Sequence, residues 1–499
     1  MIQNLNLLII FSILSAIGIM AVEKKMVRWI AFTGAAFQFI IVIGILFAYL
    51  GERALGNTAQ FLFEQKSVWF DAFHIEYHIG IDGISLAMLM LTSVVVMTGI
   101  LLSWKTEYMT KEFFFLLTSL SAGAYGFFIS LDLFTMFFFL ELAVIPKYLL
   151  ISIWGSGKKE YSAMKLALML MGGSALILIG LIGVYFQSMG PDGQHTFDLI
   201  KLAKMHISME AQRYLFPLIF TGFGVFTALF PFHTWVPDGH SSAPTAGSMF
   251  LAGISMKLGG YGCIRVATYL MPEAALEYSW IIISLATIAI IYGSFVTMMQ
   301  KDLKYINAYS SISHCGFVLM GIGMMTKTAM AGAVMQMVSH GLMTALFFGA
   351  IGMLYERTHT KDIDKLGGLL KSMPFLSSVY IIAGLCSLGL PGFSGFVAEM
   401  TILVGSWQRT GLFERITSVI ACISIVVTAV YILRAIAKAV LGPYTNEEHA
   451  TLKDARWNEK TASVVLICSI LAIGVLPFWL YNLITPDTKL IIEKIAHTF

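Results

Sequence analysis

The chain has 499 residues, of which 58% are hydrophobic and only 12% are charged, and its mean hydropathy is +0.80. Soluble domains carry about 25% charged residues, so this composition excludes a soluble multidomain protein and also a disordered or fibrous chain. The net charge of +3 is too small to favour nucleic acid as a partner. The sequence therefore predicts a polytopic membrane protein embedded in the lipid bilayer.

Apolar segments of transmembrane length recur along the whole chain. A membrane-spanning helix needs about 20 mainly apolar residues. In chain order, about fourteen segments meet this requirement: 5–22, 27–50, 84–103, 112–131, 133–154, 162–187, 214–235, 245–270, 278–299, 306–325, 328–355, 375–402, 412–437 and 461–483. Residues 486–499 alternate charged and apolar positions and predict an amphipathic tail. We expect an all-α fold with about fourteen transmembrane helices.

The Lys and Arg residues of the loops predict the orientation, because cytoplasmic loops carry an excess of basic residues. With the N-terminus outside, the inner loops hold eighteen Lys and Arg residues and the outer loops hold ten. Residues 1–22 have no basic leading region and no small-residue cleavage site, so they predict a retained first helix. We therefore expect both termini on the outer side.

Ionisable side chains lie inside several of the apolar segments. Such a group costs free energy at membrane depth unless it is paired or hydrated, so each one is a candidate functional residue. Taken singly, each is equally well explained as a structural ion pair or a buried core histidine. Five such groups on five predicted helices favour a proton relay, because hydration and neighbouring charges shift their pKa values. They are Glu141, Lys257, His314, His340 and Glu399.

Other ionisable residues also lie inside or beside the spans. Lys147, Lys165 and Arg265 fall within predicted helices and are functional candidates for the same reason. His233 and His240 lie near a helix end, where a structural role is the simpler interpretation.

Two predicted spans contain helix breakers. The seventh runs into Pro231 and Pro237, and the twelfth contains Gly389, Pro391 and Gly392. Proline removes a backbone donor, and glycine lowers the cost of irregular backbone. In lipid, such breaks persist only where the freed groups are buried in protein or line a wet cavity. The breaks stand five spans apart, which predicts inverted five-helix repeats, helices 4–8 and 9–13, each with one discontinuous member.

These features divide the chain into four predicted parts. Residues 1–110 form an N-terminal three-helix segment. Residues 111–270 form the first repeat and residues 271–440 the second. Residues 441–499 contain the last helix and the amphipathic tail.

No redox or nucleotide-binding motif accompanies these charges. The five cysteines stand singly, without a CxxC pair or a Cys/His cluster, so no zinc or iron–sulfur site is predicted. No dinucleotide-binding glycine motif, phosphate-binding loop, haem signature or flavin signature is found. We therefore expect no cofactor or metal in this chain, and its predicted chemistry is the movement of protons or ions.

Three motifs, in order along the chain, resemble those of a known family. They are residues 231–248 (PFHTWVPDGHSSAPTAGS), 311–316 (SISHCG) and 390–396 (LPGFSGF). They resemble the antiporter-like proton-pumping subunits of respiratory complex I (NADH:quinone oxidoreductase) and their relatives in multisubunit cation/proton antiporters and membrane hydrogenases. The resemblance extends over essentially the whole chain. Glu399, where sister subunits usually carry Lys, and residues 355–362 (YERTHTKD) are most similar to the M-type subunits of complex I.

This resemblance implies a proton-translocating subunit in a bacterial inner membrane, with both termini periplasmic, driven by redox chemistry in partner subunits. NADH, flavin, iron–sulfur clusters and quinone are then expected in those partners, and neighbouring antiporter-like subunits are the expected contacts. It also implies a hydrated axis at mid-membrane, running from Glu141 through Lys257 and the two histidines to Glu399. Lys165 matches a basic position that tunes Glu141.

One position departs from the family pattern. The family has a lysine seven residues before the histidine of Pro-Phe-His, paired with the fifth-helix glutamate, whereas this chain has Phe226 there. Glu141 therefore needs another partner, for which Lys165 is the first candidate. Lys147, next to Pro146, is the second. Six residues correspond to about 600° of helix rotation, which would place Lys147 on a different face of a straight helix.

Two alternative functions share most of these features. A subunit of a multisubunit cation/proton antiporter or membrane hydrogenase would carry the same motifs. A scaffold subunit that has lost pumping is the other alternative, and Phe226 is the feature that favours it.

Overall fold

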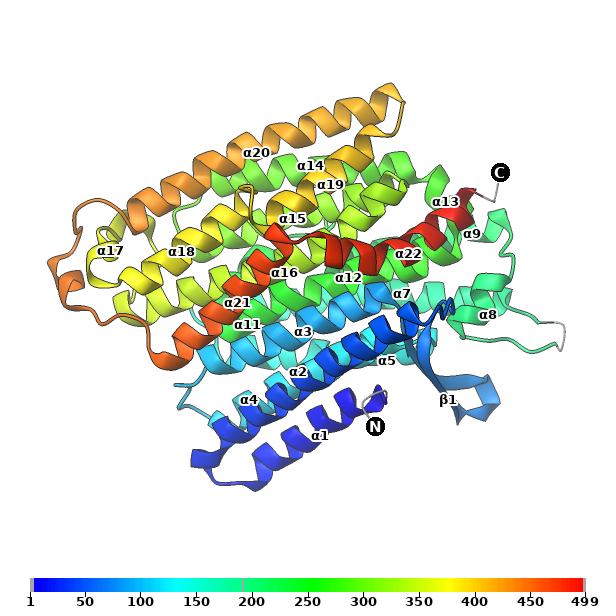
Figure 1. Cartoon of the computed structure of the whole chain (residues 1–499), viewed down its shortest axis with the longest axis horizontal. Helices are drawn as coiled ribbons and strands as arrows, with labels where there is room; N and C mark the ends of the chain where they lie inside the picture. Colours follow the sequence, from blue (N-terminus) through cyan, green and yellow to red (C-terminus); the bar gives the residue numbers. More distant parts are fainter. Residues whose placement is uncertain (1–3, 191–192, 497–499) are drawn as a thin grey trace.

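The apolar segments form long helices that lie side by side between two ends of one bundle (Figure 1). The computed structural model describes residues 4–190 and 193–496. Within these ranges, nine helical spans are long and apolar enough to cross a membrane. They are α2 (Lys24–Ala54), α3 (Gly83–Leu102), α4 (Thr110–Ile129), the pair α5 (Leu133–Leu142) and α6 (Val144–Trp154), α7 (Lys159–Gln187), α14 (Ser279–Met299), α16 (Lys327–Thr358), α20 (Leu412–Ala439) and α21 (Trp457–Val475).

Shorter or interrupted helices occupy the remaining predicted spans. They are α1 (Asn6–Ala21), α9 (Met209–Phe226), α10 (Trp235–Ser242), α11 (Thr245–Phe250), α12 (Met256–Gly262), α15 (Leu303–Gly323), α18 (Pro374–Ser387), α19 (Ser394–Trp407) and α22 (Phe478–Ala496). Connecting helices are α8 (Leu199–Lys204), α13 (Pro272–Glu277) and α17 (Leu369–Ser372). Short 3-10 helices are η1 (Asp71–Phe73), η4 (Ile363–Lys365) and η5 (Glu447–Thr451). The chain is thus a mostly helical, multi-pass membrane protein.

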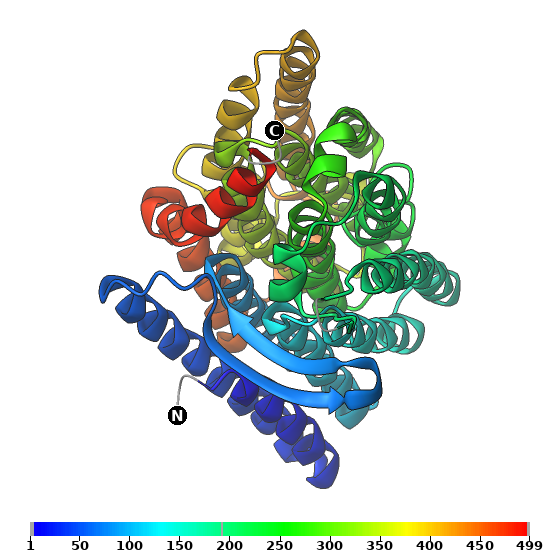
Figure 2. The same ribbon diagram turned by 90° about the vertical axis from the view of Figure 1, so that its right-hand side faces the viewer.

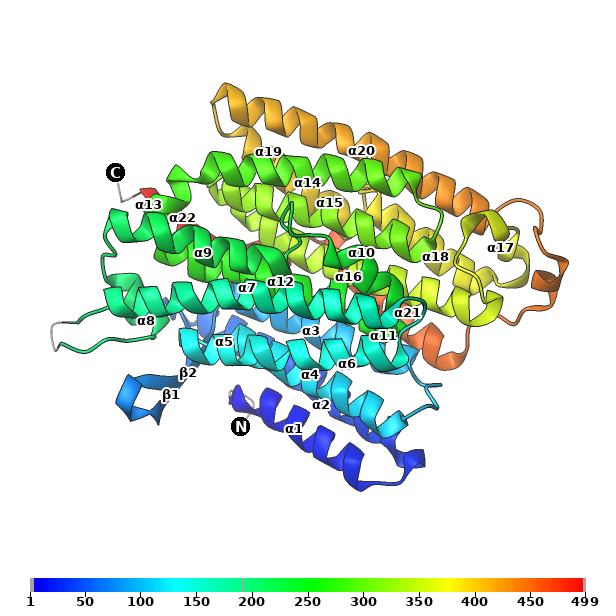
Figure 3. The same cartoon turned by 180° about the vertical axis from the view of Figure 1, so that it is seen from behind.

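Helix α16 is the centre of the bundle. The apolar part of this helix is entirely buried, and it packs against α3, α15, α18, α19 and α21. Peripheral helices such as α7 and α14, seen from behind in Figure 3, have apolar outer faces. Leu168, Ile179, Ile288 and Phe295 are among the exposed side chains there. Apolar residues on the outside and polar residues inside fit a protein whose solvent is lipid.

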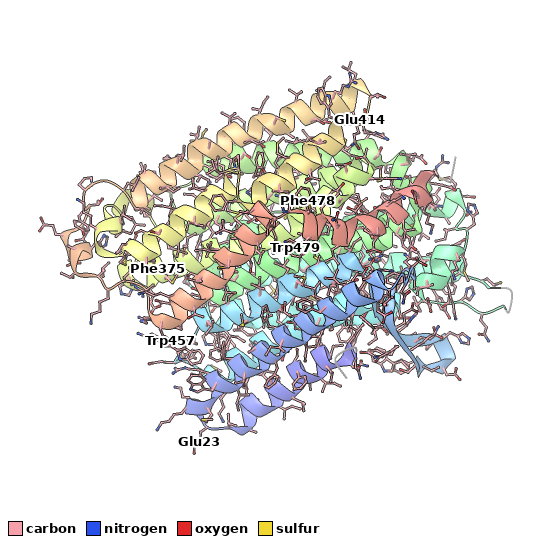
Figure 4. All side chains as sticks on the ribbon, in the orientation of Figure 1. Glu23, Phe375, Glu414, Trp457, Phe478 and Trp479 are labelled. Atoms are coloured by element: carbon pink, nitrogen blue, oxygen red, sulfur yellow. The ribbon has the colours of Figure 1, made fainter. Side chains whose placement is uncertain are left out.

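The labelled side chains of Figure 4 show how the chain alternates between the two ends of the bundle. Glu23, after the first helix, lies at the same end as Trp457, whereas Glu414 lies at the opposite end. Phe478 and Trp479 mark a bend between α21 and α22, part-way along the bundle. The predicted span 461–483 is therefore divided, and residues 486–496 of the predicted amphipathic tail are part of a helix that already begins at Phe478, while residues 497–499 lie outside the described residues.

Both predicted helix breaks are present, and a third irregular segment was not predicted. Helix α9 ends at Phe226 and α10 begins at Trp235, while α18 ends at Ser387 and α19 begins at Ser394. The span 245–270 contains two π-helices, η2 (Leu251–Ser255) and η3 (Cys263–Thr268), on either side of α12. In η3, Arg265 forms a buried ion pair with Asp82, which caps the start of α3.

A two-stranded antiparallel hairpin departs from the predicted all-α fold. Strands β1 (Leu62–Phe70) and β2 (Ile75–Ile81) lie across one end of the bundle (Figure 2). The alternation of apolar Ile75, Tyr77, Ile79 and Ile81 with more polar residues is the strand signal that a search for long apolar segments misses.

A cluster of charges fastens this hairpin to the loop before α8. Asp198 caps α8, and its carboxylate also contacts Lys66 Nζ at 2.9 Å and His78 Nδ1 at 3.1 Å. Glu64 lies 3.2 Å from the other ring nitrogen of His78. Burial lowers the pKa of His78, but the hydrogen bond and the charge of Asp198 outweigh burial and hold it above its ordinary value of 6.5.

The raised pKa of His78 predicts that the attachment of the hairpin weakens with rising pH. The contribution of His78 is fully present below pH 6.5 and is lost as the pH rises through the raised pKa of the folded state. Between about pH 6 and about pH 9, amide hydrogen exchange of β1 and β2, corrected for intrinsic rates, should become several-fold faster. In the His78→Asn variant this acceleration should vanish. An unchanged pH dependence in that variant would contradict the assignment to His78.

Candidate functional site

Lys257 stands at the centre of the irregular helix that contains η2 and η3. Its side chain is 1% exposed, and its ammonium donates a hydrogen bond to the carbonyl of Ala252 in η2. π-Helical segments within α-helices occur frequently at functional sites. Here the π-helix places a backbone carbonyl beside a buried ammonium, which lowers the cost of keeping that charge out of water.

The Lys257 ammonium also contacts a histidine on the central helix. Lys257 Nζ lies 2.7 Å from Nδ1 of His340 on α16. Because an ammonium has no lone pair, the protonated lysine donates to this nitrogen and the imidazole accepts. The His340 ring in turn lies 5.3 Å, between centroids, from the ring of His314 on α15. Three predicted relay residues from three helices are thus brought together.

The line of contacts continues from His314 to Glu399 on α19. His314 Nδ1 lies 3.0 Å from Glu399 Oε1, and its Nε2 lies 3.2 Å from the hydroxyl of Ser387 at the end of α18. The amide of Gln336 lies 3.3 Å from His314 Nδ1. Glu399 is 5% exposed. Lys257, His340, His314 and Glu399 form one connected series, which we call the relay line.

The break between α18 and α19 shapes the end of the relay line at Glu399. Gly389 has a φ of +74°, and a Cβ at this position would lie 3.0 Å from Glu399 Oε2. Across the same break, Ser339 of α16 donates a hydrogen bond to Ser394 at the start of α19, at 2.8 Å. The broken backbone therefore leaves room for the carboxylate and aligns it with His314.

Glu141 lies apart from the relay line, in the last turn of α5. It is partly buried, and its Oε1 atom has no hydrogen-bond partner among the residues that the structure describes. Lys147, on α6, is buried beside Phe226, the last residue of α9. Among the described contacts, none connects Glu141 directly to Lys257.

Lys165 on α7, expected to tune Glu141, forms its ion pair with another residue. Its ammonium lies 2.6 Å from Oδ2 of Asp238 on α10, and Tyr305 donates a hydrogen bond to the other carboxylate oxygen at 3.3 Å. The ion pair between Lys165 and Asp238 is only half-buried. Asp238 had no role in the sequence-based prediction, although it lies within the motif at residues 231–248.

The two histidines of the α9–α10 region are both buried. His233 is stacked on Phe230 and packs edge-on against Tyr292, with centroid distances of 5.3 and 4.9 Å. His240 stacks on Phe348 of α16 at 4.9 Å, and neither of its ring nitrogens has a partner within the described part of the chain. Two unpartnered nitrogens inside the protein make His240 a stronger candidate than its place near a helix end suggested.

Ser387, Gln336 and Lys304 are polar neighbours that the sequence did not single out. Lys304, at the start of α15, is buried and donates to the carbonyl of Ala243, just after α10, at 2.6 Å. By sequence it falls between the predicted spans 278–299 and 306–325, and the charge pattern does not reveal that α15 already begins at Leu303 and buries this lysine. In residues 4–190 and 193–496, no group of three His, Cys, Asp or Glu side chains is placed to hold a metal ion.

Comparison with known proteins identifies the family. A family described as NADH:quinone oxidoreductase/Mrp antiporter, transmembrane, matches residues 130–425. The chain is also 38% identical to NADH-quinone oxidoreductase subunit M of Rickettsia prowazekii, over 92% of this chain and 91% of that protein. This chain belongs to the NADH:quinone oxidoreductase/Mrp antiporter family. It is 34% identical to NAD(P)H-quinone oxidoreductase chain 4 2 of a Picosynechococcus strain, over 95% and 90% of the two chains.

Solved structures share the fold over the whole chain. A chain of respiratory complex I from Thermus thermophilus superposes with a TM-score of 0.87 at 24% identity, covering 99% of this chain and 100% of that one. A chain of the Mrp complex from Dietzia superposes with a TM-score of 0.84 at 17% identity, covering 99% of both. The predicted family is confirmed by the family match and the relatives above, and the solved structures confirm a mostly helical fold shared with membrane subunits of this kind.

The contact between Gly389 and Glu399 gives a first test of the site. A residue other than glycine at positive φ costs about 1 kcal/mol, so both Gly389→Ala and Gly392→Ala, where φ is +96°, should lower the thermal midpoint. Gly389→Ala should lower it further, because its methyl group presses on a carboxylate that His314 holds. No atom lies within 4 Å of a Cβ at Gly392, which makes Gly392→Ala the matched control. Equal thermal midpoints for Gly389→Ala and Gly392→Ala would show that the Glu399 side chain moves aside without cost.

Proposed function

We propose that this chain is a proton-translocating membrane subunit of an NADH:quinone oxidoreductase. The observation that carries the proposal is the relay line, which connects Lys257 to Glu399 through two imidazoles inside the bundle. Relatives at 34–38% identity that are named as subunits of this oxidoreductase support the choice of complex. Membership of an oxidoreductase complex does not require a redox step in this chain.

Each residue of the relay line suits a different part of proton transfer. The Lys257 ammonium stores a positive charge, and an imidazole accepts a proton on one nitrogen while releasing one from the other. His340 has Nε2 without a partner among the described residues, so this nitrogen is open to exchange toward His314. Glu399 is then the terminal acceptor. Two unit charges 4 Å apart interact by about 4 kcal/mol at an effective dielectric of 20, enough to move a proton to a neighbour.

Proton uptake is assigned to the end of the bundle where α10 ends and α15 begins. A pocket of about 420 Å³ opens there, and its lining includes Ser156, Lys304 and His359. Lys304 donates to Ala243, close to the buried His240, and His240 lies between this region and Lys257. The His240 ring, with both nitrogens available, provides a step from the pocket to the relay line.

The remaining parts of the assembly follow from the family. NADH, flavin, iron–sulfur clusters and quinone are assigned to partner subunits, and the neighbouring antiporter-like subunits are the membrane contacts. The chain is placed in a bacterial inner membrane with both termini on the periplasmic side, as the loop charges indicate. Residues 111–270 and 271–440 are the two inverted repeats, and the two observed helix breaks support this division.

The two alternative functions are less well supported. The Mrp complex has the same fold, but the curated relatives reported above carry oxidoreductase names and Glu399 replaces the usual lysine. A scaffold subunit would not need four ionisable residues from four helices in contact.

Two substitutions on the relay line test the proposal. In the assembled complex, Lys257→Ala and Glu399→Ala should each lower NADH-driven proton translocation by about tenfold or more, because each removes an ionisable link. Proton uptake or release is measured in membrane vesicles, after the amount of assembled complex has been matched. Lys489→Ala, which removes an exposed lysine 3.7 Å from Glu493, is the control and should translocate normally.

Normal translocation by both relay variants would refute the proposal and favour a scaffold. If only Lys257→Ala loses proton translocation, the proton path includes Lys257 but does not end at Glu399.

A further inference from the structure

Lys147 is a buried lysine whose ammonium has no hydrogen-bond partner among the residues that the structure describes. Its side chain is 2% exposed. An isolated charge at membrane depth is costly, so an intramembrane lysine is by default a candidate functional group. The relay line does not include Lys147.

The surroundings of Lys147 contain one aromatic ring and one carboxylate. The ammonium lies 5.9 Å from the centre of the Phe226 ring, a distance at which the face of an aromatic ring attracts a cation. The carboxylate whose charge acts on it is Glu141. Glu141 Oε1 has no partner among the described residues either. The charges of Glu141 and Lys147 thus act on each other, and each residue has an atom without a hydrogen-bond partner in the described part of the chain.

The junction between α5 and α6 lies between these two residues. Pro146 has no N–H, and its ring conflicts with the carbonyl one turn earlier, at Leu142. At Ala143 the N–H is shared between the carbonyls of Phe139 and Leu140, at 3.3 and 3.2 Å, and α6 begins at the next residue. Glu141 and Lys147 therefore lie on either side of this junction, six residues apart in the sequence.

Lys165 is less suited to serve Glu141. Its ammonium is engaged with Asp238 at 2.6 Å, and the pair is only half-buried. Lys147 is buried, and no described residue pairs with it in this way.

We propose that Lys147 is the ammonium that forms and breaks an ion pair with Glu141, and that the structure shows this pair open. When Lys147 approaches, it stabilises the Glu141 carboxylate; when it withdraws over the Phe226 ring, Glu141 takes up a proton. Phe226 fills the end of α9 and holds the lysine in its withdrawn position. This positioning role rests on the proposed proton translocation and adds a switch at the Glu141 end.

Moving the charge from α6 to α9 tests this role. Three variants of the assembled complex are compared with the native one in membrane vesicles: Lys147→Met, the double variant Lys147→Met/Phe226→Lys, and the double variant Lys147→Met/Phe226→Met. Lys147→Met should lower NADH-driven proton translocation by about tenfold or more. Lys147→Met/Phe226→Lys returns an ammonium to the same region from the facing helix, and should recover about half of the native rate or more. The lysine-free Lys147→Met/Phe226→Met should remain as impaired as the single variant.

Thermal stability separates this role from a structural one. Replacing an unpaired buried ammonium by methionine should leave the thermal midpoint unchanged or raised, because it removes a desolvated charge. A fall in stability with a parallel fall in translocation, not recovered by Phe226→Lys, would overturn the proposal, as would normal translocation by Lys147→Met. If Lys257→Ala loses translocation while Lys147→Met retains it, only the switch fails. If Lys257→Ala also retains translocation, the proposed function itself is wrong, and the switch that rests on it is wrong as well.

Discussion

The contact between the Lys257 ammonium and His340 is the constraint on which the interior of this protein depends. An ammonium in the centre of a membrane protein is tolerated only when neighbouring groups replace its water. Two features supply those groups: the π-helix η2, which presents the Ala252 carbonyl, and the fully buried α16, which presents His340. The irregular helix and the buried central helix are thus consequences of placing one charge at this depth.

The helix breaks follow from the same constraint. A continuous helix satisfies all its backbone groups and leaves no room for a carboxylate beside an imidazole. The break at Gly389 provides that room for Glu399, and α10, which follows the break after α9, carries the half-buried Asp238 and the fully buried His240. Backbone regularity is given up only where protein surrounds the freed groups, as expected for a chain in lipid.

The sequence predicted the parts of this architecture that depend on composition along one segment. Apolar length predicted the helices, and proline and glycine predicted both breaks. The buried charges identified four residues that the structure brings into contact. The hairpin was missed because its alternation is shorter and weaker than a transmembrane segment. The partner of Lys165 and the burial of Lys304 were missed because both depend on how distant helices pack.

The position of a charge in space matters more than its position in the sequence. The family pattern places a lysine at the residue that is Phe226 here, and by sequence alone that loss favours a scaffold. In the folded chain a lysine from α6 reaches over that same phenylalanine, so the region keeps a positive charge on a different helix. The electrostatic effect of an ammonium on Glu141 depends on distance and burial, and Lys147 is buried and lies close enough for the charge of Glu141 to act on it. Loss of one ion-pair lysine therefore does not imply loss of translocation.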